Sequence, residues 1–315
     1  MIVALAGGVG GARLALGLAA LLSSRRLTVI VNTADDFEHL GLAISPDLDT
    51  VMYTLAGVAS PETGWGRADE TWSFMDTLGD LGGESWFRLG DRDLAVHVLR
   101  TAARARGERL SDITRSLCER FGIGHAIVPM TDEPVRTFVE TDEGELSFQD
   151  YFVRRRCEPR VRAFRFAGSE SARAPEALSR LFGAATVETA IVCPSNPYLS
   201  IAPMLAVKEV RAWLETRAFP VVGVSPIVGG QAVKGPAAKM MRELGFEPGA
   251  SAVAKHYGDL VDGWVIDDRD AACAREIESL GRRVRVCDTL MTNHARSVAL
   301  ARVVLDFASR LGRRC

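Results

Sequence analysis

The 315-residue sequence lacks the features that mark zinc proteins, nucleic-acid-binding proteins and membrane proteins. Its six cysteines form no CxxC pair and it has only five histidines, which argues against a zinc cluster and fits free thiols in a reducing cytoplasm. The 38 basic and 40 acidic residues are interspersed, so charge gives no reason to expect nucleic acid or a membrane as partner. No segment resembles a transmembrane helix, and the first residues lack the positive region of a signal peptide. We therefore expect a cytoplasmic protein.

Short apolar runs alternate with helical patterns over much of the chain. Residues 2–6 are apolar and lead into a glycine loop, after which Leu14, Leu18, Leu21 and Leu22 recur at helical spacing. Further apolar runs end in turn residues at 27–31, 190–192, 220–224, 263–266 and 284–286. Helical patterns lie at about 203–216, 236–244, 270–280 and 294–311. This alternation predicts an α/β fold with a doubly wound, mostly parallel, Rossmann-like sheet.

The middle of the chain has a different character. It carries helical patterns at 91–106 and 111–121, and then apolar runs at 126–130, 135–140 and 145–148 with a hairpin turn at 142–144. We predict that residues 1–58 and 165–315 form a nucleotide-binding core. Residues 59–164 are predicted to form an inserted α+β lobe.

Four carboxylates follow the second apolar run, namely Asp35, Asp36, Asp47 and Asp49. Ligands bind at the carboxyl ends of strands in open α/β sheets. Two carboxylates ~4 Å apart repel by about 4 kcal/mol at an effective dielectric of about 20, so such a cluster calls for a cation or a cationic substrate group. The alternative is a solvated acidic loop in which Asp47 or Asp49 caps a helix over 50–57.

Several residues at strand ends are candidates for binding a nucleotide or its phosphates. A glycine loop lets backbone N–H groups approach an anion at a helix N-terminus, although a tight turn would explain the glycines equally well. It is not a Walker loop, and the dinucleotide fingerprint is broken because its third glycine position is an arginine, which could itself bind phosphate. The predicted contacts are Gly7, Gly8, Gly10, Gly11, Arg13, Asn32, Ser195 and Asn196. Ser195 and Asn196 could instead be turn formers.

In the predicted lobe, Arg88 follows Trp86 and Phe87. A flat heteroaromatic or anionic ligand could stack there. Asp91, three residues later, is a candidate cap for the helix over 92–106.

Taken in order, segments along nearly the whole chain resemble the 2-phospho-L-lactate transferases (CofD/FbiA type) of coenzyme F-420 biosynthesis. The segments are AGGVGGARL, VNTADD, ISPDLDT, GWG followed by ET, LGDRDLA, FQDYFV, PSNP with SI-x-P, VSPIVGG, KGPA and DTLMT. PDLDT followed by LGDRD at this spacing is far more specific than any glycine loop.

This resemblance implies a transferase of substituted phosphate groups. The donor would be a guanosine-diphosphate-activated three-carbon acid, and the acceptor would be the deazaflavin Fo (7,8-didemethyl-8-hydroxy-5-deazariboflavin). The terminal ribityl hydroxyl of Fo would attack the phosphorus that bears the acid, and GMP would leave. The acid stays open among enolpyruvyl, lactyl and 3-phosphoglyceryl.

The resemblance also implies a homodimer, Fo contacts at Asp49 and Arg88, and a divalent metal, Mg²⁺, at Asp35 and Asp49. The lobe would then contribute to the acceptor site. Because such a transfer needs positioning and charge stabilisation more than a covalent nucleophile, a carboxylate could act as proton acceptor, and Asp49 and Asp36 are the candidates.

Two other functions fit parts of the sequence. One is a non-catalytic, nucleotide-sugar-binding regulator of the same fold. The other is an NAD(P)-dependent oxidoreductase in which Asp35 would contact a ribose. The PDLDT and LGDRD segments favour the transferase.

Overall fold

The centre of the molecule is a seven-stranded sheet in the order β14-β13-β10-β9-β1-β2-β5, in which every pair of neighbours is parallel. The computed structural model describes residues 1–312. The strands are β1 (Ile2–Ala6), β2 (Leu27–Val31), β5 (Ala126–Pro129), β9 (Thr189–Val192), β10 (Val221–Val224), β13 (Gly263–Ile266) and β14 (Arg283–Val286). The predicted α/β, doubly wound sheet is confirmed.

Strand β1 shows why the sheet strands appear in the sequence as continuous apolar runs. Val3 and Leu5 pack into the core on one face of the sheet, whereas Ala4 and Ala6 pack into the core on the other. Both faces are covered by helices, so residues of either parity must be apolar.

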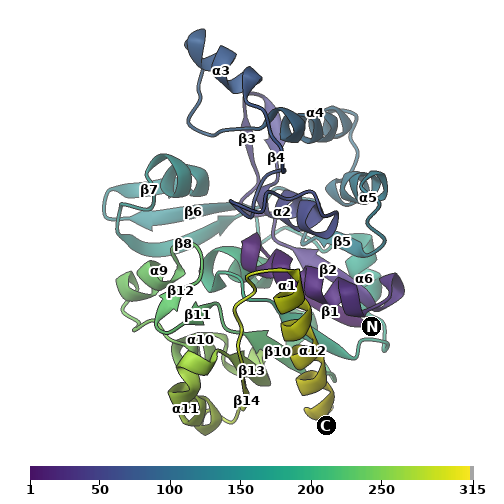
Figure 1. Ribbon diagram of the computed structural model, residues 1–315, viewed down its shortest axis with the longest axis vertical. Coiled ribbons are helices and arrows are strands. Elements are labelled where there is room, and N and C mark those ends of the chain that lie inside the picture. The colour runs from purple at the N-terminus through teal and green to yellow at the C-terminus, as the bar shows by residue number, and fades with distance from the viewer. Residues whose placement is uncertain (313–315) are drawn as a thin grey trace.

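Helices cover both faces of the sheet (Figure 1). One face is covered by α1 (Gly8–Leu21), α2 (Pro46–Leu55) and α12 (His294–Arg310). The other is covered by α6 (Glu176–Phe182), α7 (Ala202–Ala206), α8 (Lys208–Glu215), α9 (Ala237–Glu243), α10 (Ala250–Tyr257) and α11 (Ala274–Ser279). The helix predicted over 203–216 is therefore two helices, α7 and α8, which meet at Val207.

The chain reverses its direction of travel across the sheet next to β1. It runs from β1 to β2 and β5, and then returns to the other side of β1 with β9 and continues outward to β14. Ile2 lies opposite Leu27 of β2 and Thr189 of β9. The loops after β1 and β9 therefore flank a topological switch point, the usual ligand site of such sheets.

A lobe projects beyond the carboxyl ends of β1 and β2, at the top of Figure 1. It contains the hairpin β3 (Phe37–His39) and β4 (Leu42–Ile44), with α3 (Ser73–Asp80), α4 (Asp91–Ala105) and α5 (Leu110–Arg120). A three-stranded antiparallel sheet lies beside it, formed by β6 (Arg136–Thr141), β7 (Gly144–Ser147) and β8 (Val161–Ala167). The helices predicted over 91–106 and 111–121 and the hairpin turn at 142–144 are confirmed.

Two segments lie on the other side of the predicted limits of the lobe. Residues 126–129 fall within the predicted insertion, yet they form β5, which pairs with β2 at the edge of the main sheet. The β3–β4 hairpin comes before residue 59 but packs against α4 of the lobe. Lobe and core are therefore interleaved along the chain.

The remaining elements are short. They are the hairpin β11 (Ile227–Val228) and β12 (Gln231–Ala232), and the helical turns η1 (Ser24–Arg26), η2 (Asp150–Arg154), η3 (Pro197–Ile201), η4 (Gly258–Leu260) and η5 (Asp268–Cys273). Within residues 1–312, no helix has the length and apolarity needed to cross a bilayer. The five cysteines in this range are free thiols, and Cys315 lies outside it.

Candidate active site

A cavity of about 730 Å³ opens at the switch point. This volume is typical of small-molecule sites. Its walls come from the loops after β1, β2, β9 and β10, from α2 and α4, and from the loop at 289–292. The predicted residues that line it are Gly7, Gly8, Gly10, Arg13, Asp35, Asp49, Arg88, Ser195 and Asn196. Gly11, Asn32 and Asp36 are not among the described lining residues.

The glycine loop serves two different purposes. A Cβ at Gly10 would lie 2.2 Å from the carbonyl oxygen of Pro194, and one at Gly11 would lie 2.6 Å from Ser195 Oγ. These two glycines let α1 pack against the loop after β9, and the predicted phosphate contact at Gly11 stays a prediction. Gly7 and Gly8 stand at the start of α1, where Gly8 has a φ of +63°. Both amides stand at the positive end of α1 and have acceptors there, Ser195 Oγ for Gly7 and Asp47 Oδ1 for Gly8.

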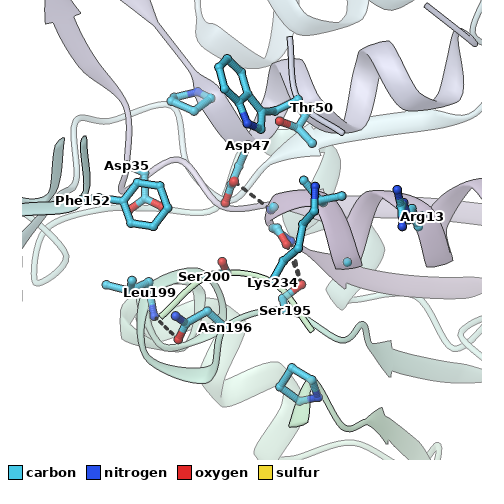
Figure 2. A pocket seen from close by; sticks show the side chains of 18 of the residues that line it. Arg13, Asp35, Asp47, Thr50, Phe152, Ser195, Asn196, Leu199, Ser200 and Lys234 are labelled. Atoms are coloured by element: carbon cyan, nitrogen blue, oxygen red, sulfur yellow. Dashed lines mark hydrogen bonds between the residues drawn. The ribbon is translucent and has the colours of Figure 1, made fainter. Parts of the chain in front are cut away.

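One of these amides already holds a carboxylate. The Gly8 N–H donates to Asp47 Oδ1 at 2.8 Å, which puts a negative charge at the positive end of the α1 dipole. Figure 2 shows Asp47 reaching to the start of α1, while Ser195 approaches the same turn from the opposite side. Helix α2 begins at Pro46 with Ser45 as its N-cap. The expectation that Asp47 or Asp49 caps a helix over 50–57 was therefore wrong.

Asp35 and Asp47 share one amide group. Asn32 Nδ2 lies 3.1 Å from Asp35 Oδ2 and 3.0 Å from Asp47 Oδ2. Burial raises the pKa of Asp35 well above its usual value, and the Asp47 charge raises it further. Burial likewise raises the pKa of Asp47 to about 6. Asn32 thus acts by holding two carboxylates together, although it is not a lining residue.

One carboxylate oxygen of Asp35 has no hydrogen-bond partner among residues 1–312. This atom, Oδ1, is buried and forms no hydrogen bond there, although the Thr137 hydroxyl lies near enough to lower the pKa of this carboxyl. An unpartnered buried oxygen beside a second carboxylate is the arrangement that a hard divalent cation would complete. The residues present therefore fit Mg²⁺, at Asp35 and Asp47.

Asp49 has a different partner. Its Oδ2 accepts from Arg100 Nη1 at 3.1 Å, and its Oδ1 pairs with Arg100 Nη2. Burial raises the pKa of Asp49, whereas the Arg100 charge lowers it. Asp49, on α2, is thereby joined to α4 of the lobe, while Asp35 is joined to Asp47.

Three further side chains complete this wall of the cavity. The Tyr53 hydroxyl donates to Asp93 Oδ1 at 2.5 Å. His97 lies between two carboxylates, with Nδ1 3.7 Å from Asp49 Oδ2 and Nε2 3.4 Å from Asp93 Oδ2. Sequence reasoning missed His97 and Arg100. The signal was their spacing, since Asp93, His97 and Arg100 share one face of the helix that follows LGDRD.

Asp36, a candidate proton acceptor, is buried beside Ser45. Its Oδ2 accepts from the Ser45 hydroxyl at 2.7 Å, and burial raises its pKa to about 7. It is not among the described residues that line the cavity, and its role as proton acceptor stays a prediction.

The residues predicted at other strand ends have structural contacts. Ser195 Oγ donates to the Gly7 carbonyl at 2.8 Å and accepts from the Gly7 N–H at 3.0 Å. The Asn196 side chain accepts from the backbone N–H groups of Tyr198 and Leu199, and so caps η3. Both residues therefore form the turn, and both also line the cavity. Arg13 lines the cavity too and donates to the Met291 carbonyl at 2.7 Å.

The mouth of the cavity is aromatic. Phe148 and Phe152 are stacked with ring centroids 5.3 Å apart, and the indole of Trp65 is half exposed. The Arg88 guanidinium lies 4.3 Å from the ring centroid of Trp72. Asp91 accepts from the N–H groups of Ser73 and Phe74 in α3, so it caps α3 and not α4, contrary to the prediction.

Known proteins match this chain along nearly its whole length. The model of a family described as "2-phospho-L-lactate transferase CofD" matches residues 2–303. A phosphoenolpyruvate transferase of Streptomyces griseus is 43% identical over 98% of this chain and 99% of its own length. A 2-phospho-L-lactate transferase of Methanosarcina mazei is 39% identical over 95% of this chain and 98% of its own.

A solved structure shares the fold. A UPF0052-family protein of Bacillus halodurans superposes with a TM-score of 0.64 at 12% identity, over 96% of this chain and 98% of that one.

Proposed function

Because this chain belongs to the 2-phospho-L-lactate transferase CofD family, whose members are transferases, we propose that it transfers a phospho-three-carbon-acid group to Fo. The donor is the guanosine-diphosphate-activated acid, and GMP is released. The observation that carries this proposal is one cavity that joins an anion-binding helix start, a carboxylate pair and an arginine-held aspartate. The 43% identity to a phosphoenolpyruvate transferase favours enolpyruvyl as the acid.

The donor occupies the side of the cavity formed by the glycine loop. The start of α1, where Val9 and Gly10 line the cavity, suits a diphosphate. Two cations, Arg13 and Lys234, line the same region, and burial together with the Arg13 charge lowers the pKa of Lys234. These groups stabilise negative charge that moves onto the leaving GMP.

The carboxylate pair is the proposed magnesium site. When bound, Mg²⁺ would bring positive charge to the phosphate oxygens of the donor. Asp35 and Asp47 would hold it, because they share Asn32 and Asp35 retains an unused oxygen. Asp49 also stays a predicted metal ligand, because its carboxylate lies within 4.8 Å of ligand atoms of Asp93 and His97, although it is paired with Arg100 as well.

The acceptor occupies the opposite side, toward the lobe. The flat ring system of Fo stacks at the aromatic mouth, near Phe148, Phe152 and Arg88. Its ribityl hydroxyl reaches Asp49, which accepts the hydroxyl proton. The ribityl oxygen then forms a bond to the phosphorus that bears the acid, and the bond from that phosphorus to GMP breaks. The enzyme works in the cytoplasm as a homodimer.

The test is to incubate the purified protein with Fo, Mg²⁺ and each of the three guanylylated acids in turn. We expect stoichiometric GMP release and a product with the mass of Fo plus the phospho-acid, with the enolpyruvyl donor fastest. Asp49→Asn, checked for folding by circular dichroism, should retain donor binding and lose turnover. A protein that binds the nucleotide but forms no product with any donor would be the regulator of the same fold, and the transferase proposal would fail.

A further inference from the structure

Two cations line the donor side of the cavity, and they come from segments far apart in the sequence. Arg13 is on α1, and Lys234 follows the β11–β12 hairpin (Figure 2). A Cβ at Gly64 would lie 2.8 Å from Val9 Cγ1 and 3.1 Å from Lys234 Nζ, so this ammonium stands close to the first turn of α1. Burial lowers the pKa of Lys234, and the Arg13 charge lowers it further. The two cations therefore repel each other, and other contacts must hold them at one site.

The hairpin that leads to Lys234 is held by a buried aspartate. Gly229 and Gly230 have φ values of +57° and +74°, and positive φ at both central residues is the backbone of a type I′ hairpin turn. The Gly229 N–H donates to both carboxylate oxygens of Asp270, at 3.0 and 3.2 Å. Asp270 is buried on η5. Its carboxylate thus fixes the turn from which the chain returns to Lys234.

The position of Arg13 depends on a second aspartate. The Arg13 guanidinium donates to the Met291 carbonyl at 2.7 Å. The same loop contains Thr289, whose backbone N–H and hydroxyl both donate to Asp267 Oδ2 at 2.9 Å. The other oxygen, Asp267 Oδ1, accepts from the Arg269 N–H at 3.1 Å. Asp267 is buried, and it fixes the loop whose carbonyl holds Arg13.

We propose that Asp267 and Asp270 are positioning residues for the donor, because they hold the loops that place two cations against its diphosphate. Strand β13, which precedes both aspartates, pairs with β10 on one side and with β14 on the other. The carboxyl ends of these parallel strands lie at one edge of the sheet, so one short segment reaches the loops after both neighbours. Neither aspartate is among the described residues that line the cavity. Each therefore acts through a loop and not by contact with the donor.

These contacts would prepare the donor side before the nucleotide arrives. A loop that is already held in its binding conformation loses less freedom on binding, and affinity rises accordingly. The Lys234 ammonium donates to the Thr63 carbonyl, so the end of this side chain is held as well as its backbone. A diphosphate between two held cations offsets their repulsion. This inference rests on the placement of the donor in the proposed function.

Titration calorimetry with GDP and Mg²⁺ tests the proposal, because GDP carries a diphosphate without the three-carbon acid. Lys234→Ala and Arg13→Ala should each weaken GDP binding at least ~10-fold, since each removes a charged donor to phosphate. Asp270→Ala should weaken it at least ~5-fold in the wild type and in Arg13→Ala, but less than ~2-fold in Lys234→Ala, where the ammonium that it positions is absent. Asp267→Asn should show the opposite pattern, with its loss disappearing only in Arg13→Ala.

Conservative variants separate positioning from a general loss of folding. Asp270→Asn keeps one oxygen that can accept from the Gly229 N–H, so it should bind GDP within about 2-fold of the wild type. Asp267→Asn has no such reserve, because both oxygens of Asp267 already accept hydrogen bonds. Asp142→Ala is the matched control, since it removes an acceptor of the Arg160 N–H in the turn between β6 and β7 and should leave GDP affinity unchanged. Circular dichroism checks that each variant is folded, and Asp270→Glu repeats the comparison should Asp270→Ala unfold.

The proposal is overturned if the aspartate variants weaken GDP binding equally in both alanine backgrounds, or if neither variant weakens it. GDP binding needs neither Fo nor turnover. The expected pattern without product formation would therefore leave this inference standing while the transferase proposal failed, and product formation with the wrong pattern would do the opposite. A wild type that binds no GDP would overturn both.

Discussion

Replacing Arg100 by methionine tests whether the Asp49–Arg100 pair holds the core and the lobe together. The guanidinium makes two contacts with the Asp49 carboxylate, and both side chains are buried. Methionine is an unbranched side chain of similar length, so Arg100→Met leaves the Asp49 carboxylate without its charged partner. Removing one member of a buried pair costs about 3–5 kcal/mol, which for a chain of this size lowers Tm by roughly 5–10 °C.

The pH dependence identifies the cause of the loss. Burial raises the pKa of Asp49, and without Arg100 that pKa should rise further. A carboxyl with a raised pKa in the folded state favours folding at low pH and opposes it as pH rises through that pKa. The deficit of Arg100→Met should therefore be greatest at neutral pH and should shrink as pH falls.

A double-mutant cycle by differential scanning calorimetry gives the decisive measurement. Asp49→Asn combined with Arg100→Met should lose at least ~2 kcal/mol less than the two single losses added together, because neither charge is then left alone. Arg115→Met, which removes an exposed pair with Asp112, is the matched control and should change stability by under about 0.5 kcal/mol. If Arg100→Met melts within 2 °C of the wild type, or if the losses simply add, the reasoning is refuted.

Three further changes test neighbouring features. Asp36→Asn should stabilise the metal-free protein by ~2–4 kcal/mol at pH 8 and by little at pH 4. The folded pKa of Asp36 is about 7, so ionisation of this buried acid opposes folding as pH rises. Equal denaturant midpoints for the variant and the wild type at both pH values would contradict this. Gly10→Ala should lower stability by ~1–3 kcal/mol, because the added Cβ would clash with the Pro194 carbonyl. Gly79→Ala is the control: nothing lies within 4 Å of a Cβ there, so this variant should be neutral or stabilising in the same thermal scan. In EDTA, Asp47→Ala should bind GDP at least ~10-fold more tightly than the wild type, as measured by titration calorimetry, because the Gly8 amide is then free. Unchanged affinity would mean that Asp47 does not compete with phosphate for this amide.

The main sheet could be predicted from the sequence because burial on both faces leaves a local signature. Strands β1, β2, β9, β10 and β13 are continuous apolar runs that end in turn residues, and each is buried along its length. Strand β5 was assigned to the lobe because its apolar run is followed closely by the other apolar runs and the hairpin turn of that region. Its place is set by pairing with β2, almost a hundred residues earlier.

The site residues also divide into those that the sequence indicates and those that only the folded structure explains. The glycine loop and the acidic residues were recognisable because they follow strands, and strand ends converge in a parallel sheet. Gly10 and Gly11 are explained only by the backbone of Pro194 and the hydroxyl of Ser195, which the fold brings to within contact distance.

Residue order and spacing, with no coordinates, were enough to establish the family resemblance, the parallel sheet and the edge where ligands bind, because periodicity and motifs are local properties. Which carboxylate faces which partner was decided by tertiary packing. Asp49 meets Arg100 from 51 residues away, and Asp35 meets Asp47 through Asn32. Electrostatic energy changes over a few ångströms, so only the folded arrangement separates the two aspartates that share an amide from the one that is paired with an arginine.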